Sequence, residues 1–180
     1  MANAAVKIQG SKDHERMHET RNGTKSNAKK ASIDALSKRL ADGIDLSLAI
    51  KQAHWNLKGP QFIGIHLMLD GFHEEVDDFN DKVAERITQL GGTARGTATS
   101  VAAESSLAPY PLDIYKIADH LAALIDRYSV YANAVRQNID DTYEAGDAGT
   151  SDLLTEISRG VDKQLWFLEA HVQELSLIHI

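Results

Sequence analysis

The chain has 180 residues, 43 % apolar and 25 % charged, with a formal net charge of −7, which favours one domain with a single buried core. It contains no cysteine, which excludes disulfides, thiolate zinc sites and cysteine nucleophiles. No apolar run approaches the ~20 residues of a membrane helix and no apolar signal-peptide core opens the chain, so the sequence predicts a cytoplasmic protein with no membrane contact.

Residues 1–28 are predicted to form a flexible basic arm. Residues 1–30 carry seven basic and three acidic side chains, a net charge of +4, which leaves −11 for residues 31–180. This division predicts polyanionic partners for the arm and cations for the body. We expect the arm to bind DNA phosphates without sequence preference. The alternative is a solubilising disordered tail. The basic residues are Lys7, Lys12, Arg16, Arg21, Lys25, Lys29 and Lys30.

Four amphipathic stretches follow and predict an all-α fold. Their apolar stripes run from Ile33 to Leu48, Ile65 to Leu90, Ile114 to Ile139 and Leu154 to Leu175. A long connection, about 92–112, separates the second stretch from the third, and a short helix is expected within it around residues 97–104. Two helices, a long crossover and two more helices are typical of the ferritin-like four-helix bundle. We expect this bundle over residues 29–176, with a tail at 177–180.

The second stretch carries four metal-type ligands that are symmetric about one point. His66 and Asp70 are four residues apart, as are Asp81 and Glu85, and both the outer and the inner pair centre between residues 75 and 76. On a helix the four share one face within an arc of roughly 100°, but His66 and Asp81 lie about 22 Å apart along the axis. One subunit therefore cannot close a site with all four. Two antiparallel copies about a two-fold axis can.

His54, near the end of the first stretch, joins this set. Two imidazoles and three carboxylates suit iron or manganese with open positions, and zinc less well. Imidazoles bind ferrous iron well and carboxylates favour the ferric state, so the set is suited to oxidising Fe²⁺. The alternative interpretation is a solvated acidic helix face with incidental histidines, since Glu74, Glu75, Asp77 and Asp78 lie on the same helix.

Residues 51–63, His66 to Phe72, and Asp81 to Arg86 resemble the Dps family of mini-ferritins, as do residues 110–114 and 158–171. The resemblance covers about residues 30–174, and all five positions of the family's ferroxidase signature match. It implies a hollow dodecamer in which His54, His66 and Asp70 of one subunit meet Asp81 and Glu85 of its neighbour. The implied reaction is oxidation of Fe²⁺, preferably by hydrogen peroxide, with ferric mineral stored inside and nucleoid DNA protected.

The resemblance also implies acidic pores for iron entry near the start of the fourth helix. Asp147 and Asp152 are the positions carried over, and Asp141 and Glu144 are expected to add to the field. The alternative is ordinary carboxylates at helix ends. Trp55, beside His54, either shields against radicals, as in relatives, or packs as an aromatic anchor at the interface.

A match to the H-E-x-x-H pattern of zinc peptidases lies in the arm, at His14, Glu15 and His18. Its flanks are not apolar enough for a catalytic domain, so we do not expect peptidase activity. The leading hypothesis is a ferroxidase and storage cage. The alternative is a nucleoid-structuring scaffold with a weak or vestigial metal site, favoured by the basic arm.

Overall fold

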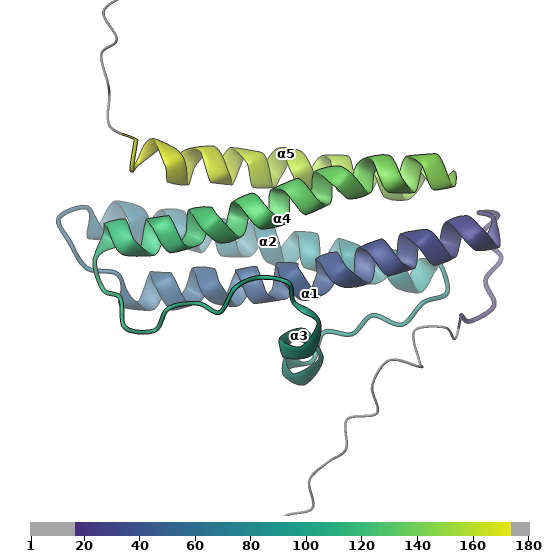
Figure 1. Cartoon of the computed structure of the whole chain (residues 1–180), viewed down its shortest axis with the longest axis horizontal. Helices are drawn as coiled ribbons and strands as arrows, with labels where there is room; N and C mark the ends of the chain where they lie inside the picture. Colours follow the sequence, from purple (N-terminus) through teal and green to yellow (C-terminus); the bar gives the residue numbers. More distant parts are fainter. Residues whose placement is uncertain (1–16, 174–180) are drawn as a thin grey trace, which may run out of the picture.

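The computed structural model describes residues 17–173. Its four long helices are α1 (Ser26–Asn56), α2 (Phe62–Gln89), α4 (Ile117–Ala145) and α5 (Ala148–Ala170). They run along the long axis of the molecule in Figure 1, while the short helix α3 (Ala98–Glu104) lies outside the bundle on the crossover between α2 and α4. The described residues contain no strand. The predicted all-α bundle, with a helix inside its long crossover, is confirmed.

Most residues of the predicted apolar stripes form the core of the bundle, but Leu48 of the first stripe is exposed. Val76, Val83 and Ile87 of α2 are fully buried, as are Leu36 and Ile50 of α1. The three residues of α2 are seven and four positions apart and the two of α1 are fourteen apart, spacings that keep them on the inner face of their helix. Truncating one such side chain to alanine typically costs about 2–5 kcal/mol.

One polar chain of contacts crosses this apolar core and joins three helices. The hydroxyl of Tyr128 on α4 donates to Gln164 Oε1 on α5 at 2.7 Å, and Gln164 Nε2 donates to Glu75 Oε2 on α2 at 2.6 Å. Burial raises the pKa of Tyr128 well above its usual value, so the hydroxyl stays a donor. Without these contacts the polar groups would be buried in the core with no hydrogen-bond partner. The contacts also fix the register of α2, α4 and α5.

The crossover is held against the bundle by two buried charges. Asp42 on α1 accepts the backbone N–H of Ser106 at 2.6 Å and pairs with Arg39 at 2.8 Å. Arg127 on α4 donates to the carbonyls of Ala108 and Pro109. Backbone groups in this long connection thereby find partners without regular structure.

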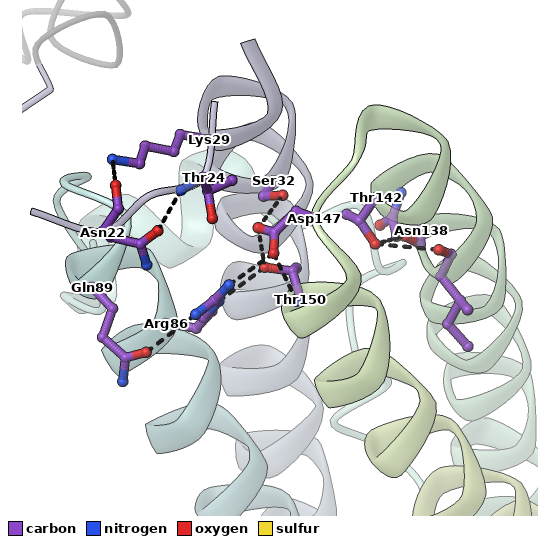
Figure 2. A network of polar contacts seen from close by, with 11 residues as sticks. Asn22, Thr24, Lys29, Ser32, Arg86, Gln89, Asn138, Thr142, Asp147 and Thr150 are labelled. Atoms are coloured by element: carbon purple, nitrogen blue, oxygen red, sulfur yellow. Dashed lines mark hydrogen bonds and ion pairs between the residues drawn. The ribbon is translucent and has the colours of Figure 1, made fainter. Parts of the chain in front are cut away.

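The turn between α4 and α5 is built around Gly146 and Asp147. Gly146 has φ +93°, the left-handed conformation that ends many helices, and Asp147 caps the start of α5. The carboxylate of Asp147 accepts hydrogen bonds from Ser32 of α1, Arg86 of α2 and Thr150 of α5, as Figure 2 shows. Three helices therefore meet at this one side chain.

The described part of the predicted arm is residues 17–28, of which 17–25 contact the bundle and 26–28 begin α1. The backbone N–H of His18 donates to the carbonyl of Gly91 at 2.7 Å, and Met17 packs against the core. Lys29 Nζ donates to the carbonyl of Asn22, also seen in Figure 2. Helix α1 begins at Ser26, three residues before the expected bundle boundary, because Ala28 is already a core residue. Residues 1–16 and the predicted tail at 177–180 lie outside the described residues.

Candidate metal centre

Two histidines face each other where α1 ends and α2 begins. His54 lies in the last turn of α1 and is 7 % exposed, and its ring stacks on that of His66 with centroids 3.6 Å apart. His54 Nδ1 lies 3.0 Å from the carbonyl oxygen of His66, and His66 Nδ1 lies 3.1 Å from that of His54. A carbonyl only accepts, so each Nδ1 carries the proton. In each neutral ring this leaves the lone pair on Nε2, ready to bind a metal.

Asp70 completes this group from one turn further along α2. Each of His54, His66 and Asp70 offers a ligand atom within 4.8 Å of the others. A hydrogen bond from Lys51 lowers the pKa of Asp70, and the nearby histidines act in the same direction. The carboxyl is therefore ionised at neutral pH, which a metal ligand requires.

Lys51 is a site residue that the sequence analysis did not single out. Its Nζ lies 2.5 Å from Asp70 Oδ1, so a cation already neutralises the carboxylate in this structure. A bound metal ion competes with this ammonium for the same oxygen. Lys51 precedes His54 by three residues, and such residues share a helix face, so the spacing itself signals its presence at the site.

Asp81 and Glu85 do not join the group within one chain. Both are exposed on α2, and Asp81 is eleven residues, or about 16 Å of helix, beyond Asp70. Of the five predicted ligands, the structure brings together three. Among residues 17–173 these three form the only group of three or more histidine and acidic side chains with metal-binding spacing.

Large apolar side chains surround this centre on the surface. Leu48 and Trp55 share a face of α1, and Ile63 and Leu67 share a face of α2. All four are more than half exposed, Trp55 at 68 %. An exposed apolar patch beside polar groups is typical of a surface that another protein covers. The exposure of Trp55 suits both interpretations of its role.

The four predicted pore carboxylates have different environments. Asp141, Glu144 and Asp152 are exposed near the junction of α4 and α5. Asp147 is 3 % exposed, and both of its oxygens accept hydrogen bonds within the chain. In the single chain Asp147 is a helix cap that also binds Arg86, and its assignment to a pore stays a prediction.

The predicted DNA-binding residues also differ in their environments. Arg21, Lys25 and Lys30 are exposed, but Lys29 is 8 % exposed with its ammonium bound to Asn22, so it is not available to a phosphate. Lys7, Lys12 and Arg16 lie outside the described residues, as do His14 and Glu15 of the peptidase-like pattern. Within residues 17–173, no helix is both long and apolar enough to span a bilayer.

Comparison with known proteins gives consistent matches. The family model of the ferritin-like domain matches residues 33–178. The DNA protection during starvation protein of Agrobacterium fabrum is 56 % identical over 88 % of this chain and 98 % of that protein. The structure of DpsC from Streptomyces coelicolor matches with a TM-score of 0.85 and 30 % identity, over 91 % of this chain and 95 % of that one. A Dps structure from Mycobacterium smegmatis matches with a TM-score of 0.84 and 32 % identity, over 88 % and 97 %.

Proposed function

Because the chain belongs to the Dps family of ferritin-like proteins, we propose that it is a ferroxidase that assembles into a dodecameric iron-storage cage. Its substrates are Fe²⁺ and, preferably, hydrogen peroxide, and its product is a ferric mineral held inside the cage. We place this activity in the cytoplasm, at the nucleoid. The observation that carries the proposal is the preorganised group of His54, His66 and Asp70.

The donor set of this group fits iron as a substrate. Two neutral imidazole nitrogens bind Fe²⁺, and the ionised Asp70 favours the ferric product. Since Nδ1 of each ring is engaged by a carbonyl, both imidazoles are held in place. Asp70 pairs with Lys51 and lies 3.4 Å from His54 Nδ1, so it must exchange these contacts for the ion. In the reaction two Fe²⁺ each lose one electron, the O–O bond of peroxide breaks, and two protons are taken up to give two water molecules.

A second subunit supplies Asp81 and Glu85 in this proposal. Two observations support it: both carboxylates are exposed and distant from their own histidines, and the apolar side chains around the histidines are exposed in the single chain. A two-fold axis near residue 75 brings the two halves together twice, which gives two equivalent sites for each pair of subunits.

For iron entry we propose a pore lined by exposed carboxylates near the junction of α4 and α5. Asp141, Glu144 and Asp152 are the exposed candidates. A surface of one sign concentrates counter-ions ahead of the site. The net charge of −11 over residues 31–180 acts in the same sense.

The proposed activity is tested by mixing the assembled apoprotein with Fe²⁺ without oxygen and then adding hydrogen peroxide. We expect ferric absorbance to rise faster than in a protein-free mixture and the iron to stay soluble. Oxidation at the protein-free rate, with ferric precipitate, contradicts the ferroxidase proposal. It then favours the alternative, a DNA-binding scaffold with a weak or vestigial metal site.

We also propose non-specific DNA binding by the N-terminal residues. Deleting residues 1–16 removes Lys7, Lys12 and Arg16, and is expected to weaken DNA retardation on gels at low salt because phosphate contacts are lost. Replacing the exposed Arg21, Lys25 and Lys30 with alanine in the shortened chain is expected to abolish the rest.

The matched control for DNA binding is Lys58→Ala/Lys116→Ala, which removes exposed charges that follow the end of α1 and precede the start of α4. It should retard DNA as the wild type does. Unchanged retardation after the deletion and the three substitutions would show that the N-terminal residues do not bind DNA.

A further inference from the structure

A second pair of metal-type ligands lies on α2 beyond the first. His73 and Asp77 repeat the four-residue spacing of His66 and Asp70, seven residues further along. Seven residues are nearly two helical turns, so the two pairs share a helix face. Neither His73 nor Asp77 contributes to the group formed by His54, His66 and Asp70.

A buried serine orients this second pair. Ser47 on α1 is 3 % exposed, and its hydroxyl lies 2.6 Å from Asp77 Oδ1 and 2.8 Å from His73 Nδ1. The hydroxyl has one hydrogen, and it donates that hydrogen to the carboxylate. His73 Nδ1 must then be the donor to the oxygen of Ser47. In the neutral ring, the lone pair is therefore on Nε2.

A carboxylate oxygen lies close to that nitrogen. His73 Nε2 lies 3.5 Å from Asp77 Oδ2, so in the neutral ring two acceptor atoms lie close together without a hydrogen to share. Either a proton on the imidazole or a metal ion between the two atoms relieves this arrangement. A tetrahedral ion with bonds of about 2.1 Å holds two ligand atoms about 3.4 Å apart. The separation found here matches that geometry.

The subunit pairing of the proposed function supplies further ligands at the same place. A two-fold axis between residues 75 and 76 sets Glu85 opposite His66 and Asp81 opposite Asp70. The same operation sets Asp78 of the partner subunit opposite His73, and Glu74 of the partner subunit opposite Asp77. Both carboxylates are exposed in the single chain, where that of Asp78 pairs with Lys82 at 2.7 Å, a contact that the metal ion would replace. The second set thus repeats the one histidine and three carboxylates that α2 gives to the first set, nearer to the axis and without a counterpart of His54.

We propose that His73 and Asp77, oriented by Ser47, bind a divalent first-row metal ion at a second site. Glu74 and Asp78 of the partner subunit complete its coordination, a part of the inference that rests on the subunit pairing proposed above. One imidazole with carboxylates suits Fe²⁺, Mn²⁺, Co²⁺ or Zn²⁺. The site gives each subunit a place for a cation close to the first centre and separate from it.

Equilibrium dialysis of the assembled full chain against Co²⁺ tests the second site. Co²⁺ binds imidazole and carboxylate ligands, and without added peroxide it is not oxidised. His73→Ala/Asp77→Ala is expected to bind about one Co²⁺ per chain fewer than the wild type. Ser47→Ala keeps both ligands but loses their orientation, and is expected to bind the same ion roughly 10-fold more weakly. His171→Ala, which removes an exposed histidine at the end of α5, is the control and should bind as the wild type does.

Comparison of two double variants distinguishes a failure of the second site from a failure of the proposed function. Unchanged Co²⁺ binding by His73→Ala/Asp77→Ala overturns the second site and leaves the pair as an ion pair beside Ser47. Unchanged binding by His66→Ala/Asp70→Ala instead counts against the first centre, and so against the proposed function. Size-exclusion chromatography verifies assembly. If the alanine variant does not assemble, His73→Gln/Asp77→Asn, whose side chains still hydrogen-bond to Ser47, takes its place in the same measurement.

Discussion

Cages built only from His66→Ala/Asp70→Ala chains will oxidise Fe²⁺ no faster than a protein-free mixture of Fe²⁺ and peroxide, and so will cages built only from Asp81→Ala/Glu85→Ala chains. The first variant removes the ligands that lie beside His54, and the second removes carboxylates that lie far from them in the same chain. Both variants are expected to lose the same oxidation activity, because each site takes ligands from two subunits.

Co-assembly of the two inactive variants is expected to restore activity. A mixed pair holds one site with every ligand and one site with neither half, because the symmetry is isologous. In random co-assembly half of the pairs are mixed, so about a quarter of all sites are intact and the initial rate should recover to about a quarter of the wild-type rate. Ferric absorbance after unfolding and refolding the mixture measures this recovery.

The control for this complementation is Glu169→Ala/His171→Ala, which removes an acid and a histidine from the end of α5 and should keep the wild-type rate. Two results contradict the shared centre. One is a mixture as inactive as its components. The other is full activity in either pure variant, which would place the oxidation elsewhere on the cage.

The second large effect is on stability, at Asp147. Replacing Asp147 with alanine is expected to lower the free energy of unfolding by about 3–5 kcal/mol, because it removes a helix cap and leaves the half-buried Arg86 without its ionic partner. Urea unfolding followed by circular dichroism measures the loss. Asp152→Ala, an exposed carboxylate five residues away, is the matched control and should stay within about 0.5 kcal/mol of the wild type.

The pH dependence of this effect has a definite sign. Burial alone would raise the pKa of Asp147, but hydrogen bonds from Thr150 and Ser32 and the charge of Arg86 outweigh it and lower the pKa. The carboxylate therefore adds stability above its unfolded pKa of about 3.9 and loses that contribution as the pH falls through the lowered folded value. The difference in the free energy of unfolding between the wild type and Asp147→Asn should become smaller at acid pH. A constant difference would contradict the ionic role.

The periodic part of the fold was predictable from local spacing. The stripes containing Val76 and Val83, or Leu154 and Ile157, predict helices because burial repeats every three to four residues. The long crossover and its short helix followed from composition. The start of α1 at Ser26 was not predicted, because Ala28 is a weak hydrophobic signal that becomes a core position only through packing.

Charged residues were harder to assign, since their roles depend on groups distant in the sequence. Gly146 followed by Asp147 is a typical helix end and helix cap, so the local signal was available, but Arg86 comes from a helix sixty-one residues earlier. The sequence around Lys29 is that of any solvent-facing lysine, and only the structure shows that its ammonium donates to the carbonyl of Asn22. In contrast, the separation of Asp81 and Glu85 from the histidines followed directly from the rise of the helix.

The reciprocal bonds between His54 and His66 tie the durability of the fold to the chemistry. Each imidazole is at once a proposed ligand and a hydrogen-bonding partner of the backbone of the other helix, at the point where α1 ends and α2 begins. A chain that loses one ring to oxidative damage loses one of these two hydrogen bonds as well. Oxidation of either ring is therefore expected to weaken metal binding and the α1–α2 hairpin together.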